Sequence, residues 1–271
     1  MKRGHVYARA PPIQYRGRDL EILQLNTDRK KITHDLLQNI VKRDRIDICV
    51  TSEPNINITK KLKYLADKRC DAAIVVANQI ITIKRHGRGE GYVWAELDSV
   101  ILYSCYISPN NTMTDFKRFL RNLGQEMRGQ QKPAIVAGDF NAKSAAWGSP
   151  KEYRRGDVLA EWLQERNMIV LNSGNKPTFI SGEQESHIDI TTCTEKLTPY
   201  VSEWRVSDEE TLGYHQMLRY KITAALKNAK TQRKQLGDGG TRRREQKSSK
   251  ETWRSAWLCR KKKGATSTFG A

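Results

Sequence analysis

The chain has 271 residues, 38% of them hydrophobic, which is enough for one large domain with a buried core. The net charge of +18, from 48 Lys and Arg against 30 Asp and Glu, favours polyanionic partners such as nucleic acid. Because no apolar run approaches the ~18 residues of a transmembrane helix, and none follows the basic N-terminus, we expect neither a membrane span nor a secretory signal. The five cysteines are scattered, which favours a reducing intracellular compartment.

The predicted elements begin at residue 20, after a basic N-terminal segment (residues 1–19) that we expect to be disordered. A strand over 20–25 is followed by a helix, with Thr33 as its predicted N-cap and an apolar stripe at helical spacing. A second strand follows over 46–51. The first part of the chain is therefore typical of an α/β protein.

Later elements continue this mixture of strands and helices. The stretches 73–84, 92–97 and 100–107 predict β-strands, with the turn-prone HGRGEG (86–91) between the first two. Two helices are expected, over 115–128 and around Val158–Leu163, and short strands over 134–138, 168–171, 187–192, 202–206 and 216–223. The pattern predicts two packed, mostly antiparallel sheets flanked by helices, in a domain over 20–226.

Residues 227–271 differ in composition from that domain. They hold 14 Lys and Arg against three Asp and Glu and lack apolar periodicity, so we expect a disordered basic tail. Such a tail could hold nucleic acid, act as a nuclear address, or be a solvated remnant.

Polar side chains stand at or near the ends of the predicted strands. They are Asn26, Asp28, Glu53, Tyr106, Asp139, Asn141, Asp189 and His215. Isolated charges are costly to bury, so these groups are expected to share one wet cleft or a metal. Carboxylate and amide oxygens suit Mg²⁺, which can polarise a phosphoryl oxygen and stabilise a leaving alkoxide. The set favours phosphodiester cleavage.

Each of these residues also has a structural interpretation. Glu53 before a proline could be an exposed turn, and Asn26 with Asp28 could cap the next helix. Asp139 and Asn141 could form an Asx-turn, Tyr106 a half-buried strand aromatic, and His215 a structural histidine. Only Asp189, between two isoleucines, clearly needs a partner. The order of the set favours the catalytic interpretation.

Several motifs occur in a recognisable order. They are LQLNTDR (23–29), TSEPN (51–55), CYISPN (105–110), VAGDFNAKSAAWGS (136–149), RRGDVLAEWL (154–163), PTF (177–179) and SHIDIT (186–191). Together they resemble the endonuclease/exonuclease/phosphatase superfamily, and AGDFNAKS with WGS resembles the apurinic-type endonuclease domain of non-LTR (LINE-type) retrotransposons. The resemblance covers about residues 20–224 and implies a four-layer α/β sandwich.

The resemblance also implies a role for each residue at the strand ends. Glu53 would be the principal metal carboxylate, with Asn26 and Asp28 beside it. Asp139 would activate water, and Asn141 would bind the phosphate or that carboxylate. Tyr106 would contact the scissile phosphate, and Asp189 would orient His215. Thr178 and Ser186 match positions near the bound DNA backbone. Further candidates for DNA contacts are Arg88, Lys143 and Arg154, although the basic loops that carry Arg88 and Arg154 could equally be ordinary solvated loops.

One departure from the family pattern concerns the histidine. The family usually shows Ser-Asp-His where this chain has Gly213-Tyr214-His215. In the family that Asp assists the metal site, so its loss is expected to reduce metal affinity or turnover ~10–100-fold.

The expected function is that of a Mg²⁺-dependent (or Mn²⁺-dependent) endonuclease. It would act as a monomeric domain in the nucleus and nick double-stranded DNA, leaving a 3′-hydroxyl that primes reverse transcription. The alternatives are an abasic-site endonuclease or other phosphodiesterase, and a catalytically impaired relic that only binds nucleic acid. The family's domain normally continues into a reverse transcriptase, which these 271 residues do not resemble, so an excised domain or a truncated copy is expected.

Overall fold

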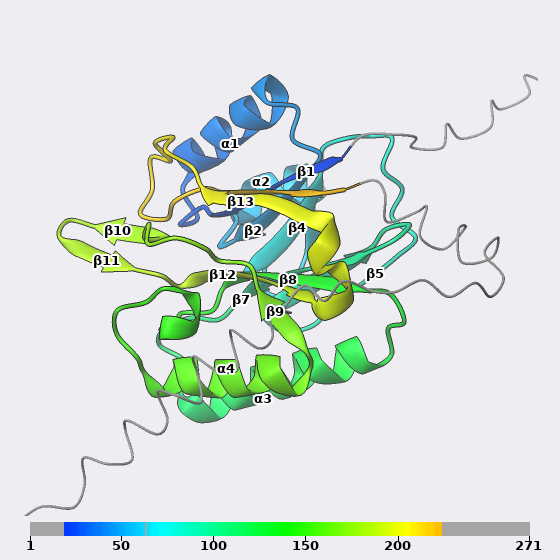
Figure 1. Cartoon of the computed structure of the whole chain (residues 1–271). Helices are drawn as coiled ribbons and strands as arrows, with labels where there is room; N and C mark the ends of the chain where they lie inside the picture. Colours follow the sequence, from blue (N-terminus) through cyan, green and yellow to red (C-terminus); the bar gives the residue numbers. More distant parts are fainter. Residues whose placement is uncertain (1–18, 63, 224–271) are drawn as a thin grey trace, which may run out of the picture.

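The computed structural model describes residues 19–62 and 64–223, which form two six-stranded sheets packed face to face (Figure 1). The first sheet has the order β13-β14-β1-β2-β4-β3 and the second β5-β6-β7-β8-β12-β9. The strands of the first sheet, in chain order, are β1 (Leu20–Asn26), β2 (Ile48–Ser52), β3 (Leu65–Ala66), β4 (Ala72–Val76), β13 (Val201–Val206) and β14 (Leu218–Ile222). Those of the second are β5 (Arg85–Arg88), β6 (Tyr92–Glu96), β7 (Ile101–Tyr106), β8 (Ala134–Asp139), β9 (Met168–Val170) and β12 (Asp189–Thr194).

Each sheet contains one parallel pair, β1 with β2 and β7 with β8, and its other pairs are antiparallel. This confirms the predicted pair of mostly antiparallel sheets. A separate hairpin of β10 (Phe179–Ser181) and β11 (Gln184–Ser186) projects from one end of the sandwich (Figure 1).

Helices cover the outer faces of both sheets. Figure 1 shows α1 (Lys31–Arg43) and α2 (Ile56–Lys61) on the side of the first sheet, and α3 (Met113–Arg128) and α4 (Arg154–Glu165) beneath the second. Two short 3₁₀ segments, Ala145–Trp147 and Glu195–Tyr200, complete the helical elements of the described residues. The four-layer sandwich is therefore confirmed.

Alternation along β1 explains how two of the three apolar layers form. Ile22 belongs to the apolar cluster between the two sheets, whereas Leu23 and Leu25 pack with Leu37 and Ile40 of α1. Successive strand residues point to opposite faces, so one apolar strand contributes to two layers. The third cluster lies between the second sheet and helices α3 and α4.

Several local predictions are corrected. Thr33 is not the N-cap of α1, because the helix begins two residues earlier and Lys30 takes the capping position. The segment 73–84 is a strand only to Val76, and part of the supposed turn 86–91 pairs with β6 as β5. In that pairing the backbone hydrogen bonds of β5 outweigh the low strand propensity of its glycine.

The predicted disordered segments fall almost entirely outside the described residues, since these begin at residue 19 and end at residue 223. Within the described ranges, helices fall short of the length and hydropathy that a membrane-crossing helix requires. Cys49, Cys70, Cys105 and Cys193 are free thiols.

Candidate active site

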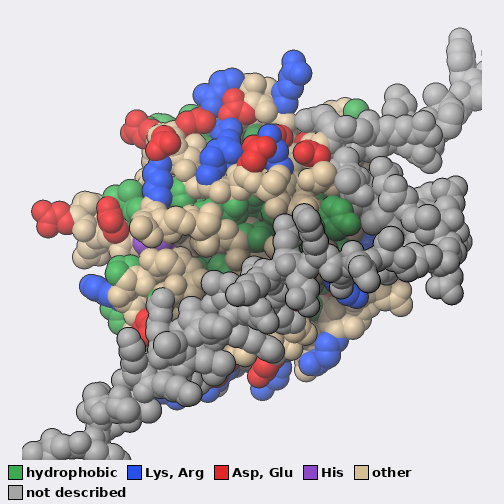
Figure 2. All heavy atoms as spheres, viewed as in Figure 1, with side chains coloured by type: hydrophobic (Ala, Val, Ile, Leu, Met, Phe, Trp, Pro, Cys, Tyr) green, Lys and Arg blue, Asp and Glu red, His purple; other side chains and the backbone are tan. Residues whose placement is uncertain are grey.

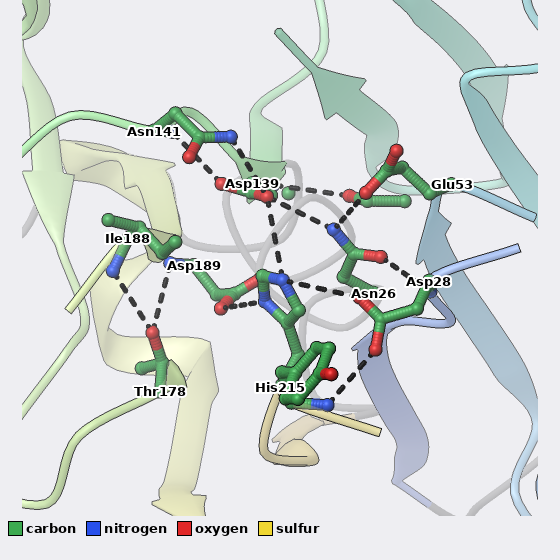
Figure 3. Close-up of polar contacts among 12 residues, drawn as sticks. Asn26, Asp28, Glu53, Asp139, Asn141, Thr178, Ile188, Asp189 and His215 are labelled. Carbon is green, nitrogen blue, oxygen red and sulfur yellow. Dashed lines mark hydrogen bonds and ion pairs between the residues drawn. The ribbon is translucent and has the colours of Figure 1, made fainter. Parts of the chain in front are cut away.

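The predicted polar residues gather at one edge of the sandwich because of strand register. In the parallel pair β1–β2, Asn26 lies opposite Ser52, directly before Glu53. In the parallel pair β7–β8, Tyr106 lies opposite Asp139, which in turn lies opposite Asp189 on β12. Strand ends from both sheets therefore meet at one place, and Figure 3 shows their side chains converging around Asp139.

The backbone at this edge includes unusual conformations. Asp28, Glu53 and Asn141 have φ angles of 48°, 44° and 46°, in the left-handed region. Such conformations cost about 1–3 kcal/mol each for residues with a side chain, and they cluster at functional sites. The site is therefore shaped partly against local backbone preference.

His215 and Asp189 form a buried pair. The histidine Nδ1 lies 2.8 Å from Asp189 Oδ2, and the two residues are 4% and 2% exposed. Burial by itself would lower the pKa of His215, but the carboxylates of Asp189, Asp139 and Asp28 raise it to about 9. The imidazole is thus held in a fixed orientation and favoured in its charged form.

The other ring nitrogen of His215 faces the centre of the site. His215 Nε2 lies 3.9 Å from Asp139 Oδ2 and 3.8 Å from Asp28 Oδ1 (Figure 3). A polar group of substrate or water that lies beside these atoms could contact both the imidazole N–H and a carboxylate.

Asp139 is buried at the end of β8 and fixed by several donors. Its carboxylate accepts hydrogen bonds from the main-chain and side-chain nitrogens of Asn141 at 2.9 and 3.1 Å, and its own main-chain amide donates to Ser52 Oγ at 3.1 Å. Burial and the neighbouring Asp189 raise the pKa of Asp139 to about 7. A carboxylate tuned in this way can accept a proton near neutral pH.

Asn26 links the two sheets at the centre of the site. Its side-chain nitrogen donates to Glu53 Oε2 at 3.1 Å and to Asp139 Oδ2 at 3.0 Å, while its oxygen accepts from the main-chain amide of Asp28 at 2.9 Å. The structure thus directs the amide nitrogen, not the oxygen, toward the carboxylates. In this arrangement Asn26 holds the carboxylates of Glu53 and Asp139 in place, and its predicted role as a metal ligand stays a prediction.

Glu53 is held by its own main chain and by its neighbours. Its amide donates to the carbonyl of Asp71 at 2.7 Å, and its carbonyl accepts from Thr27 Oγ1 at 2.7 Å. Arg29 Nε lies 3.7 Å from Glu53 Oε1. The Glu53 side chain remains 23% exposed, so solvent or a ligand can reach it.

The segment after Glu53 is fixed by a buried histidine that the sequence did not indicate. Asn55 donates its main-chain N–H to His34 Nε2 at 3.0 Å and its side-chain N–H to the carbonyl of Arg29 at 2.8 Å. Burial lowers the pKa of His34, which keeps the imidazole neutral and able to accept. His34 therefore positions the turn that carries Glu53.

Tyr106 lies at the end of β7 beside the same carboxylates. Burial, together with the negative charges of Glu53 and Asp139, raises the pKa of its hydroxyl above the usual range. The hydroxyl stays protonated and can donate a hydrogen bond to an anionic ligand.

Asp28 lies next to His215 and comes from the turn after β1. Its Oδ2 accepts from the main-chain amide of Tyr214 at 3.0 Å and lies 3.4 Å from Lys30 Nζ. A carboxylate therefore does lie beside the position where the family pattern predicts an aspartate, although it comes from the turn after β1.

Thr178 was predicted to lie near DNA, but its side chain is fully buried. Its Oγ1 accepts hydrogen bonds of 3.0 Å from the main-chain amides of both Ile188 and Asp189. The hydroxyl thus positions Asp189 and presents no surface to DNA.

Asn172 supports the same strand by donating a hydrogen bond to the Asp189 carbonyl at 2.9 Å. It is a polar residue just after strand 168–171, so the same strand-end argument could have found it.

The other predicted DNA-binding residues lie in three places. Lys143 and Ser186 line one groove of about 500 Å³, beneath the hairpin β10–β11. Arg154 is exposed at the start of α4, and Arg88 lines a separate groove of about 850 Å³ between β5 and α3. Glu183 and Glu185 make the end of the hairpin acidic, and Figure 2 shows acidic side chains at its protruding end.

A hard cation fits part of this site. Glu53 and Asp28 offer partly exposed carboxylates, with side chains 23% and 14% exposed, and Mg²⁺ prefers such oxygens while retaining waters. Asp139, Asp189 and His215 form a tighter group whose ligand atoms lie within 4.8 Å of one another, but two of its members already bind each other. The oxygen-rich side near Glu53 is the better match for Mg²⁺.

Comparisons with known proteins agree with this geometry. A model of the endonuclease-reverse transcriptase family matches residues 100–219. In Drosophila melanogaster, the 115 kDa protein in type-1 retrotransposable element R1DM is 27% identical over 173 residues, covering 58% of this chain and 17% of that protein. The RNA-directed DNA polymerase from mobile element jockey is 25% identical over 156 residues, covering 50% and 16%. The chain spans about a sixth of these relatives.

Two solved structures share the fold. The endonuclease domain of TRAS1, a telomere-specific non-LTR retrotransposon, superposes with a TM-score of 0.67 at 25% identity, over 76% of this chain and 98% of that one. An AP endonuclease from Archaeoglobus fulgidus gives a TM-score of 0.60 at 10% identity, over 76% and 99%, and shows the likeness of fold alone. Together these comparisons support an apurinic-type endonuclease domain of the non-LTR retrotransposon type.

Proposed function

We propose that this domain is a Mg²⁺-dependent endonuclease that nicks one strand of double-stranded DNA. The observation that carries the proposal is the placement of His215, which is held by Asp189 at 2.8 Å and presents Nε2 3.9 Å from Asp139. This places an imidazolium donor next to a carboxylate of raised pKa, the two groups that an attacking water and a phosphoryl oxygen require.

The roles of the side chains follow from this geometry. Asp139, oriented by Asn141, accepts a proton from the attacking water, and His215 donates a hydrogen bond to a phosphoryl oxygen. Tyr106 donates a further hydrogen bond to the phosphate. Glu53 and Asp28 would hold Mg²⁺ or Mn²⁺, and a bound ion would supply positive charge to polarise the phosphoryl oxygen and stabilise the leaving alkoxide.

The biological use that we propose is target-primed reverse transcription of a retrotransposon. The matched relatives are named as retrotransposon proteins, and a nick that leaves a 3′-hydroxyl would supply the primer. The domain would act as a monomer on chromosomal DNA in the nucleus. Lys143, Arg154, Ser186 and Arg88 are proposed contacts to DNA.

The direct test is the relaxation of supercoiled plasmid by the purified chain in the presence of Mg²⁺. We expect nicked circles from the wild type and their loss with EDTA, with Asp139→Ala and with His215→Ala. Asp35→Ala is a matched control, because this carboxylate lies on α1 with half of its side chain exposed and pairs only with Lys31 among the described contacts. Nicking by Asp139→Ala at the wild-type rate would exclude the assignment.

An impaired nuclease that binds DNA is the second candidate, since Tyr214 replaces the aspartate that the family usually has before the histidine. Tyr214→Asp separates the two candidates. Nicking by both the wild type and the variant supports an active enzyme, whereas nicking by the variant alone identifies the natural chain as a binder. A strong preference for an abasic oligonucleotide over intact plasmid would instead support abasic-site cleavage.

A further inference from the structure

Tyr214 is an exposed aromatic residue whose backbone is fixed on both sides. Its main-chain N–H donates to Asp28 Oδ2 at 3.0 Å, and its carbonyl accepts from the main-chain N–H of Ile180 on β10 at 2.8 Å. The side chain nevertheless remains 48% exposed. The residue is thus rigidly placed while its ring faces solvent directly beside His215.

Two neighbours give this ring a defined orientation. The Tyr214 and Phe179 ring centroids are 6.0 Å apart, and Phe179 packs edge-on to His215 with centroids 4.9 Å apart. Three rings therefore form a row from the solvent to the buried histidine. An aromatic ring carried by a fixed backbone loses little conformational freedom when it binds a flat ligand.

A positive charge accompanies the exposed ring. Lys30 Nζ lies 4.2 Å from the Tyr214 ring centroid, and also 3.4 Å from Asp28 Oδ2. A basic group beside an exposed aromatic matches the chemistry of a nucleotide, in which a flat base is joined to a phosphate. An anionic partner without a flat ring would leave the Tyr214 ring without a contact, and a purely apolar partner would leave the Lys30 ammonium without one.

We propose that Tyr214, with Lys30 Nζ over one face of its ring, is a stacking platform for a nucleobase that is unstacked next to the scissile phosphate. The proposal rests on the proposed function, because the base reaches Tyr214 only when the neighbouring phosphate lies at His215. Since a paired base must leave the helix to reach the ring, the platform favours sites where unstacking is easy, such as bulges and flexible pyrimidine–purine steps. The residue at this position thus contributes to target choice.

The test uses the full chain and duplex DNA that carries 2-aminopurine as a one-nucleotide bulge, in EDTA so that the DNA stays intact. Anisotropy of a label reports binding, and quenching of 2-aminopurine reports stacking. We expect the wild type and Tyr214→Phe to quench the bulged base, and to bind the bulged duplex about 5- to 100-fold more tightly than a fully paired one. Tyr214→Leu, which keeps apolar volume without a ring, is expected to bind both duplexes equally and to quench little.

Leu212→Ala is the matched control, because Leu212 is similarly exposed (44%) on the same loop but offers no ring; it is expected to behave as the wild type. Binding without quenching by the wild type, or wild-type quenching by Tyr214→Leu, would refute the platform while leaving the nuclease proposal intact. Failure of the wild type to bind either duplex would contradict both proposals. Because Tyr214 is exposed, its substitution is not expected to unfold the protein, and a thermal melt of each variant checks that the fold is retained.

Discussion

The carboxylate of Asp28 accepts a 3.0 Å hydrogen bond from the main-chain amide of Tyr214, which lies 186 positions later in the sequence. The same carboxylate places its other oxygen 3.8 Å from His215 Nε2. The turn after β1 therefore supplies a negative charge beside His215. The residue directly before His215 does not, because it is a tyrosine where the family usually has an aspartate. The contact thereby ties the turn after β1 to the Gly213-Tyr214 segment.

Gly213→Ala tests whether that contact is needed. A Cβ on residue 213 would lie 2.9 Å from Asp28 Oδ2, so the carboxylate has to shift, which is expected to weaken its bond to the Tyr214 amide. We expect plasmid nicking to fall about 10-fold, as for loss of a group that supports a metal ligand, with little change in melting temperature. Gly129→Ala is the control, because its Cβ would meet only the Glu126 carbonyl at 4.0 Å. Equal nicking by the two variants would show that the position of Asp28 is unimportant.

His34 provides a test of how Glu53 is positioned. In His34→Leu the Asn55 amide loses its acceptor, so the turn that carries Glu53 is expected to shift and the Mg²⁺ concentration for half-maximal nicking to rise about 10-fold. His34→Gln keeps an acceptor oxygen and is expected to recover much of the wild-type value. A purely structural role would lower stability in both variants without changing the Mg²⁺ dependence.

Thr178→Val tests the support of Asp189. The substitution leaves the buried amides of Ile188 and Asp189 without their shared acceptor, which is expected to lower the free energy of unfolding by about 1–3 kcal/mol. Denaturant unfolding measures this change. Thr59→Val is a matched control, since the buried Thr59 hydroxyl only adds to a bond that its own amide already makes with the Asn55 carbonyl. Equal stability of the two variants would contradict the assigned role of Thr178.

The dependence of DNA binding on pH follows from the raised pKa values of Asp139 (about 7) and His215 (about 9). As pH rises, Asp139 gains negative charge near pH 7 and His215 loses positive charge near pH 9, and both changes weaken phosphate binding. In EDTA, we expect affinity for duplex DNA to fall in two steps between about pH 6 and about pH 10. Because each group influences the pKa of the other, Asp139→Asn and His215→Gln should each leave a single step, at a pH shifted from that of the wild type. A wild-type profile without steps would contradict these pKa shifts.

Sequence patterns predicted most of the fold because apolar alternation is strong in the central strands. The stretches around β1, β7 and β8 are apolar on both faces or alternate cleanly, and they were placed within a few residues. The errors fell where pairing overrides local preference, as in β5, which has low strand propensity but is completed by hydrogen bonds to β6.

The candidate site was predicted as a set of residues, since a polar group at the end of an apolar strand is visible in sequence. Sequence could not predict that the Asn26 amide turns its nitrogen to Glu53 and Asp139, or that Thr178 faces inward. Side-chain direction depends on donors and acceptors from other strands, and these become neighbours only when both sheets are packed.

By itself, the sequence determined the type of fold, the strand ends that carry the chemistry, and the departure at Gly213-Tyr214-His215. Only the tertiary structure decided which groups meet there: that His215 is paired with Asp189, that Asp28 reaches the Tyr214 amide, and that the Tyr214 ring faces solvent beside Lys30. Strand and helix patterns are local properties of the chain. Contacts among residues far apart in sequence depend on register and layer packing, which the local pattern does not specify.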